Sequence, residues 1–175
     1  MKPLLPLVAC AVLAAALPAA AQKPPAPPSA ATEIGELMKA GRHDEALKRA
    51  EARLKDNPRD AQVRFMRGVI LAEQGKTVEA AAVFETLTQE FPELPEPYNN
   101  IALLHARAGR YEAARQALET ALRNDPGYRP ARLNLGDVLL RLALQAWETA
   151  AAVAPPDAAL QRKLQLAREL IAPAR

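Results

Sequence analysis

The stretch AGRYEAARQALETALRNDPGY, residues 108–128, decides the fold. Gly109 can end one helix in the left-handed conformation, and Asp125, which precedes a proline, ends the next. Between these ends the apolar residues recur with the spacing of one helix face: Ala114, Leu118 and Ala121. The stretch therefore predicts a turn and an amphipathic helix whose apolar face needs a partner.

The same unit recurs along the chain with a period of 34 residues. Three residue types keep this period, and they are Gly41, Gly75 and Gly109; Ala46, Ala80 and Ala114; and Pro58, Pro92 and Pro126. Glycine ends a helix, proline follows one, and alanine lets two helix backbones approach closely, so each type stands where its properties are needed. The pattern predicts a helical repeat protein.

Each period divides into two helices joined by a turn. In the second unit the pattern predicts helices over residues 61–73 and 77–90, and in the third over residues 96–108 and 111–124. One such hairpin buries too little apolar surface to be stable alone, so the hairpins must stack on one another.

This period and its punctuation resemble the tetratricopeptide repeat (TPR) family, whose layout is W-x2-L-G-x2-Y followed by Ala, Phe and Pro. The residues that carry the resemblance are Gly68, Gly75, Ala80, Phe84 and Pro92 in one copy, and Tyr98, Gly109, Tyr111, Ala114, Ala121 and Pro126 in the next. The resemblance covers residues 30–156. It implies an all-α fold, a right-handed superhelix of about four antiparallel helix pairs.

Both ends of the array depart from the pattern. The opening helix of the first copy, predicted over residues 32–40, directly follows a proline-rich segment. In the fourth copy, Ala143, Trp147 and Pro155 correspond to Ala114, Leu118 and Pro126, but they lie 29 residues on instead of 34. Five residues are thus missing from its turn, and residues 139–153 contain no glycine or proline. Two structures remain open for this copy, a hairpin or one long or kinked helix.

A last helix is predicted over residues 158–171, with Asp157 as its N-cap. Its apolar residues form one stripe, as expected of a helix that caps the end of a solenoid. The predicted organisation is a signal peptide over 1–21, a Pro/Ala-rich spacer over 22–31, TPR-like repeats over 32–156 (32–60, 61–94, 95–128 and 129–156), and a capping helix over 157–172.

The first residues have the layout of a secretory signal peptide. Lys2 precedes an apolar run over residues 4–17, and three alanines end at Ala21. This layout predicts cleavage after Ala21 and an exported protein, in the periplasm of a Gram-negative bacterium. In one alternative the segment remains as an N-terminal membrane anchor. In another, Cys10 is acylated, because LVAC at residues 7–10 resembles the lipobox of bacterial lipoproteins.

No catalytic, cofactor or metal site is predicted. The two histidines, His43 and His105, lie in different repeats, and neither has neighbours at zinc-ligand spacing. Phosphate-binding loops, dinucleotide fingerprints and nucleophile elbows are absent from the sequence. With a formal net charge of +3, interleaved acids and bases and 4% aromatic residues, the chain also lacks the basic face of a nucleic-acid binder.

The resemblance implies that the first helix of each repeat lines a concave groove that binds a protein or peptide partner. The matching positions are Phe65, Val69 and Glu73; Asn99, Leu103 and Arg107; and Leu133, Asp137 and Arg141. A groove partly covered by the terminal helix or the spacer is the alternative. Asn100 and Asn134 match asparagines of the TPR subclass that clamps a C-terminal carboxylate, but Ala31 and Pro130 replace its lysines, so this clamp is not expected.

The sequence thus predicts a non-catalytic interaction module or scaffold that binds a partner segment in the groove. The alternative function is a lipid-anchored structural subunit of an envelope assembly complex, held in the membrane through Cys10. Self-association through the terminal repeats is a further open possibility.

Overall fold

The computed structural model describes residues 29–172, and within this range all regular structure is α-helical. The predicted signal peptide, Cys10 and most of the spacer lie outside the described residues. The described helices are α1 (Ala30–Lys39), α2 (His43–Asp56), α3 (Ala61–Glu73), α4 (Thr77–Glu90), α5 (Pro95–Arg107), α6 (Tyr111–Asn124), α7 (Arg129–Val153) and α8 (Ala158–Ile171). The predicted all-α repeat fold is confirmed.

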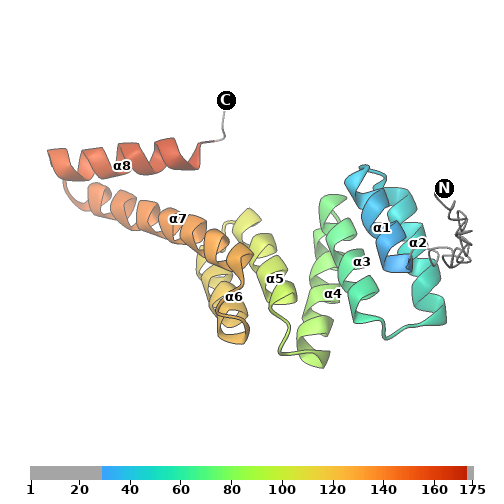
Figure 1. The fold of residues 1–175 in the computed structure, drawn as a ribbon. Coiled ribbons are helices and arrows are strands. Elements are labelled where there is room, and N and C mark those ends of the chain that lie inside the picture. The colour runs from blue at the N-terminus through green and yellow to red at the C-terminus, as the bar shows by residue number, and fades with distance from the viewer. Residues whose placement is uncertain (1–28, 173–175) are drawn as a thin grey trace, which may run out of the picture.

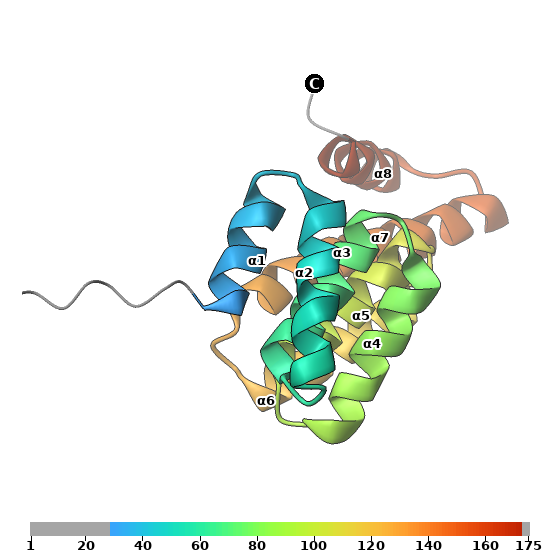
Figure 2. The ribbon, with the colours of Figure 1, turned by 90° about the vertical axis from the view of Figure 1, so that its right-hand side faces the viewer.

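The first six helices form three antiparallel pairs, α1 with α2, α3 with α4 and α5 with α6. Figure 1 shows these pairs side by side in chain order, with α7 packed against α5 and α6. Figure 2, turned by 90°, shows α8 apart from the stack that α1 to α6 make. The bounds of α3, α4, α6 and α8 are those predicted, and α5 begins one residue earlier, at Pro95.

A glycine in the left-handed conformation ends the first helix of each of these three pairs. Gly41, Gly75 and Gly109 have φ angles of 70°, 76° and 72°. The amide of Gly109 donates to the carbonyl of Ala106 at 3.0 Å, and the amide of Arg110 donates to the carbonyl of His105 at 3.0 Å. This two-bond pattern ends a helix and needs a positive φ, which glycine adopts without strain.

The pairs are held together by small and large apolar residues that alternate at the contacts. The repeat alanines Ala46, Ala80 and Ala114 are fully buried, as the close approach of two backbones requires. Phe84 on α4 is fully buried against Gly68 on α3, where an added Cβ would lie 2.6 Å from the phenyl ring. The glycine therefore makes room for the aromatic side chain.

The array begins at a capped helix. The Oγ of Ser29 accepts a hydrogen bond from the amide of Thr32 at 3.2 Å, so α1 starts at Ala30 and includes the last two residues of the predicted spacer. Glu36, which is exposed on α1, pairs with Lys39 of the same helix, and Glu33 pairs with Arg49 on α2. These charged groups keep the exposed part of the first helix hydrated.

The fourth repeat is one long helix and not a hairpin. No glycine follows 34 residues after Gly109, where Ala143 stands, and α7 continues through this point to Val153. Since five residues of the turn are missing and no glycine supplies a positive φ, the helix has no signal to stop. Sequence reasoning had left this choice open.

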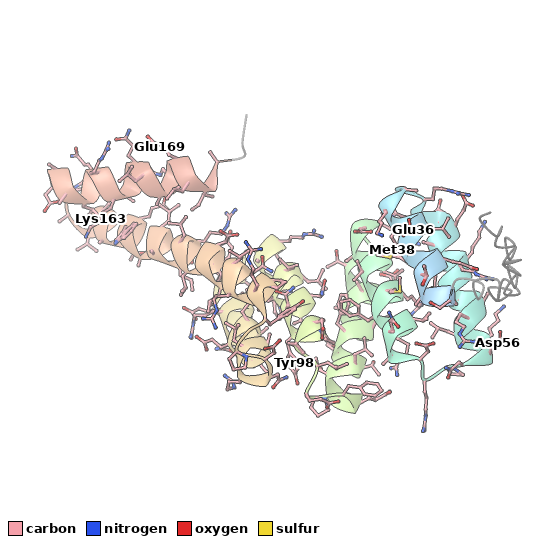
Figure 3. All side chains as sticks on the ribbon, viewed as in Figure 1. Glu36, Met38, Asp56, Tyr98, Lys163 and Glu169 are labelled. Atoms are coloured by element: carbon pink, nitrogen blue, oxygen red, sulfur yellow. The ribbon has the colours of Figure 1, made fainter. Side chains whose placement is uncertain are left out.

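The last helix, α8, begins where Asp157 accepts from the amide of Leu160 at 2.7 Å, which confirms the expected N-cap. It runs back along the C-terminal half of α7, and α7 is the only described helix that it contacts. Figure 3 shows Lys163 and Glu169 of α8 at one end of the molecule and Glu36 of α1 at the other. Thus α8 covers α7 but does not cover the third repeat.

Candidate partner-binding surface

Three helices, α3, α5 and α7, place the nine predicted groove residues at corresponding positions. The 34-residue period puts Phe65, Asn99 and Leu133 at one position, Val69, Leu103 and Asp137 at the next, and Glu73, Arg107 and Arg141 at the third. Four of these nine residues line two hollows, and the other five lie outside them.

The hollow between α5 and α7 contains three of the predicted residues, Leu103, Asp137 and Arg141. Its volume is about 180 Å³, and its other lining residues are Ala102, Ala106, Leu118, Asn134 and Val138. The Nη1 of Arg141 donates to the hydroxyl of Tyr111 at 3.4 Å, and the guanidinium carbon lies 5.6 Å from the ring centroid. Tyr111, at the start of α6, thus fixes Arg141 beside an apolar floor.

A second hollow, of about 430 Å³, lies between α3, α4 and α5 and contains Phe65. The other lining residues are Ala61, Gln62, Leu87, Leu94, Glu96 and Pro97. The ring of Phe65 packs on that of Phe84 with centroids 5.8 Å apart and planes inclined by 51°. Because Phe84 is fully buried, it holds Phe65 in place as the apolar floor of this hollow.

Five of the nine predicted groove residues line neither hollow, and two of these five are Asn99 and Leu133. Asn99 is only 5% exposed, and its Oδ1 accepts from the Nδ2 of Asn134 at 2.8 Å, so it joins α5 to α7 and is not available to a partner. Leu133, at the same repeat position, has no following helix to cover it and is 54% exposed on α7. The predicted groove position Asn99 is therefore buried between α5 and α7, whereas Leu133 is exposed.

The other three predicted residues, Val69, Glu73 and Arg107, also line neither hollow. Val69 packs on the buried cluster around Phe84. Glu73 is exposed, with its Oε2 3.1 Å from the Nδ1 of His43, and Arg107 is exposed as the last residue of α5. A cation at this end of a helix interacts favourably with the helix dipole.

Sequence reasoning missed several lining residues, including Ala106, Val138, Gln62 and Leu94. Ala106, Val138 and Gln62 stand one helical turn, or one position, away from the predicted stripe, and Leu94 is the N-cap of α5. The signal that could have found them is the facing geometry of neighbouring first helices, since each hollow is shared between two of them. Asn134 was considered only for the carboxylate clamp, yet it lines the hollow and holds Asn99.

The terminal helix leaves both hollows free, because no residue of α8 lines either of them. The alternative in which the N-terminal spacer covers the groove falls largely on residues outside the described range. The hollows are therefore open with respect to every described helix, and they combine apolar floors with Glu96, Asp137 and Arg141 at their borders.

The two histidines show no arrangement for catalysis. His105 on α5 accepts a hydrogen bond at Nδ1 from the Nε of Arg110 at 3.0 Å. Burial and, next, the charge of Arg110 lower the pKa of His105, while Glu85 opposes this shift, so the neutral form is favoured. Among residues 29–172 no group of three or more His, Cys, Asp or Glu side chains could hold a metal ion. No helix of the described part is long and apolar enough to span a membrane.

Comparison with family models identifies the repeat. Two models described as tetratricopeptide repeat match residues 35–95 and 95–128, which together make up more than half of the 175-residue chain. These matches cover the second and third helix pairs and most of the first, and they end just before α7.

Solved structures with the same fold are similar over most of the chain. The crystal structure of TTC0263, a TPR protein of Thermus thermophilus, is 22% identical with a TM-score of 0.61, and the match covers 81% of each chain. The first TPR domain of Spaghetti (RPAP3) bound to an HSP90 peptide is 17% identical with a TM-score of 0.59, over 65% of this chain and 90% of that one.

A third structure, of Naa15/Naa10 bound to HypK-THB, is 20% identical with a TM-score of 0.58 over 81% of this chain. The match spans only 22% of that much longer chain. At these identities the likeness is one of fold.

Proposed function

Because this chain belongs to the tetratricopeptide repeat family, we propose that it is a non-catalytic interaction module whose concave face binds an extended segment of a partner protein. TPR proteins are in general protein–protein interaction modules, and one structural neighbour is bound to a peptide. The observation that carries the proposal is the hollow between α5 and α7, where the predicted residues Leu103, Asp137 and Arg141 meet.

The chemistry of the two hollows defines the partner segment. Leu103 and Val138 in one hollow, and Phe65 and Leu94 in the other, offer apolar contacts to side chains such as leucine or phenylalanine. Asp137 forms no ion pair within the described residues and is exposed, so it favours a basic residue next to the apolar anchor. Rigid stacked helices present both hollows in advance, which reduces the entropy that binding costs.

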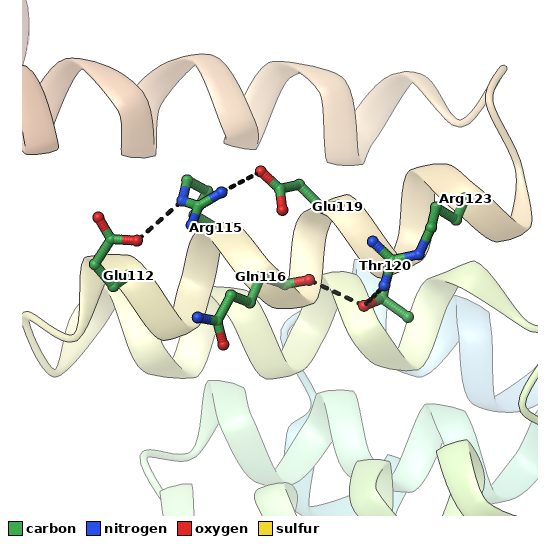
Figure 4. Close-up of polar contacts among 6 residues, drawn as sticks. All are labelled: Glu112, Arg115, Gln116, Glu119, Thr120 and Arg123. Atoms are coloured by element: carbon green, nitrogen blue, oxygen red, sulfur yellow. Dashed lines mark hydrogen bonds and ion pairs between the residues drawn. The ribbon is translucent and has the colours of Figure 1, made fainter.

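The test is photo-crosslinking in cells that express the full chain, with a photoreactive residue at Leu103. The matched control carries it at Gln116 on α6, on the far side of that helix pair. Figure 4 shows that the side chains around Gln116 are engaged with one another, since Arg115 contacts Glu112 at 2.9 Å and also Glu119, and Arg123 donates to Thr120.

We expect a discrete adduct from Leu103 alone, which weakens when Asp137 is replaced by Arg on the same chain. Adducts from Gln116 alone, or from neither position, would show that the concave face does not bind the partner. An adduct from Leu103 that is indifferent to Asp137→Arg would retain the groove but contradict the basic partner segment.

We also propose that the module acts outside the cytoplasm, in the periplasm or cell envelope. The support is the basic start, the apolar run over residues 4–17 and the three alanines that end at Ala21. Mass spectrometry of the protein from fractionated cells tests this location. A periplasmic chain that begins at Gln22 is expected, whereas an intact cytosolic chain would contradict export and an acylated Cys10 would replace it with lipid anchoring.

A further inference from the structure

We infer that the uncovered face of α7 pairs with the same face of a second copy, around a two-fold axis that passes beside Gly136. This face, the open end, consists of Leu133, Gly136 and Leu139. It is separate from the two hollows of the concave surface, so the inference goes beyond the proposed binding of a partner segment.

The open end corresponds to a face that a second helix covers in another repeat, but no described helix covers it here. Gly68 and Gly136 occupy the same repeat position, 68 residues apart. A Cβ at Gly68 would lie 2.6 Å from the Phe84 ring, whereas a Cβ at Gly136 would meet nothing within 4 Å. Likewise Leu71 is 4% exposed, but Leu139, two periods later, is 47% exposed. The second helix that covers this face in the other repeats is absent here.

The helices described for residues 29–172 do not fill this site. Because α7 continues to Val153, its second half cannot fold back on its first half. The remaining helix, α8, is fixed further along, since Lys163 Nζ lies 5.8 Å from the Trp147 ring centroid and Arg168 Nη2 lies 2.9 Å from Glu148 Oε1. No described helix of the chain therefore covers this face, which leaves it accessible to a second molecule.

Exposed apolar side chains are concentrated at this end of the molecule. Of the large apolar side chains that are exposed on residues 29–172, all but Val78 lie on α7 and α8: Leu133, Leu139, Val153, Leu166 and Leu170. At the other end, α1 carries the exposed Glu36, which is paired with Lys39, and the partly exposed Glu33, which is paired with Arg49 on α2. Head-to-tail stacking would set apolar residues against these charges, so the open end has no match on the first repeat.

The spacing of the open end is self-complementary. Leu133 precedes Gly136 by three residues, and Leu139 follows it by three, on neighbouring faces of one helix. When two copies of α7 cross antiparallel at Gly136, Leu133 of each copy meets Leu139 of the other, as a two-fold interface requires. The missing Cβ of Gly136 lets the backbones approach at the crossing. Such pairing closes at two copies and leaves no free end to extend.

The dimer that we expect is weak. A stable interface buries about 1,200 Å² or more in total, which is more than three residues of one helix supply. We therefore expect a monomer–dimer equilibrium in the micromolar range, where a single charge at the crossing is enough to shift it.

The experiment is sedimentation equilibrium of the purified chain over a wide concentration range. We compare the wild type with Leu139→Glu in the open end and Val78→Glu on α4, which is the matched control because Val78 is 80% exposed elsewhere. Circular dichroism shows that each variant is folded. We expect the wild type and Val78→Glu to dimerise alike, and Leu139→Glu to stay monomeric even at concentrations more than tenfold higher.

A second variant tests whether the two copies of α7 cross at Gly136. In a background in which Cys10 is replaced by serine, Gly136→Cys places two thiols at the two-fold axis, and mild oxidation is expected to give a disulfide-linked dimer, whereas Val78→Cys gives none. A wild type that is monomeric throughout, or a dimer that Leu139→Glu leaves intact, would overturn the inference. Equal crosslinking at Val78 and Gly136 would do the same, because it would show random collisions.

Discussion

Corresponding residues of the second and fourth repeats are buried in one repeat and exposed in the other. In the second, Gly68 on α3 receives the fully buried ring of Phe84 from α4, and Leu71 is 4% exposed. In the fourth, the equivalent Gly136 and Leu139 lie on the surface of α7. The side chains of the first helix are thus similar in both repeats. What differs is the turn, since Gly75 ends α3 while α7 runs on without a stop.

The comparison shows that the apolar face of a first helix and the turn that follows this helix are independent features of a repeat. Apolar residues on a first helix show which face it can bury, but the glycine that follows decides whether a second helix returns to cover that face. In the fourth repeat the apolar face is present and the turn is lost. A core position then becomes a surface that is available for association.

The largest expected effect comes from truncating the aromatic side chain of each repeat. Phe84→Ala removes a fully buried ring between α3 and α4 and should lower the free energy of unfolding by about 3–5 kcal/mol. Trp147→Ala acts on a half-buried side chain between α7 and α8, so it should mainly loosen α8. Urea unfolding measures the first effect, and amide hydrogen exchange of α8 the second.

If the two repeats were equivalent, both truncations would lower the global stability equally. A loss from Trp147→Ala as large as that from Phe84→Ala would therefore show that α7 and α8 are part of one cooperative core. An unchanged exchange rate in α8 would show that Trp147 does not hold this helix.

A smaller effect, with opposite signs at the two sites, is expected for Gly68→Ala and Gly136→Ala. At Gly68 the new methyl group meets the Phe84 ring, and overpacking should cost about 1–3 kcal/mol. At Gly136 the methyl group meets nothing, and alanine in place of glycine within an exposed helix should stabilise by about 0.5–1 kcal/mol.

Chemical denaturation at concentrations where the chain is monomeric measures both changes. Destabilisation by Gly136→Ala would mean that α7 has a neighbour at this point in the monomer. A neutral Gly68→Ala would mean that the Phe84 ring moves aside without cost, and the contrast between the two repeats would disappear.

Much of the fold could be predicted because the determining interactions are local. The turn glycines need a positive φ, the helix caps are neighbours in sequence, and the 34-residue period follows from these signals. The course of the fourth repeat stayed open, because a missing turn does not show where the following chain will pack.

The candidate site could be predicted only in part. Leu103, Asp137 and Arg141 do line one hollow, since repeat geometry places one face of each first helix towards it. The burial of Asn99 is not predictable in this way, because it depends on Asn134, which lies 35 residues later on α7. Such contacts depend on how far each helix turns towards the next, and one sequence carries no signal for that rotation.

The smallest expected effect concerns His105, whose exposure lies between those of its repeat equivalents Leu71 and Leu139. At the repeat position of buried Leu71 and exposed Leu139, α5 has the half-buried His105, whose pKa is lowered by burial and by Arg110. The unfolded chain therefore binds a proton at a higher pH than the folded chain does. The stabilisation by neutral His105 is fully present above its unfolded pKa and is lost as the pH falls through that value towards the folded pKa.

We expect the free energy of unfolding to fall by a few tenths of a kcal/mol as the pH drops through about 6.5, a small change because His105 is partly exposed to solvent. His105→Gln should remove this slope, since glutamine can still accept from Arg110 but does not titrate. Urea unfolding at a series of pH values compares the two proteins. A slope that survives in His105→Gln would assign the effect to another group, and stability that rises with acid would mean that folding favours the charged imidazole. In that case His105 would be hydrated like the exposed Leu139 position of the fourth repeat and not desolvated like the buried Leu71 position of the second.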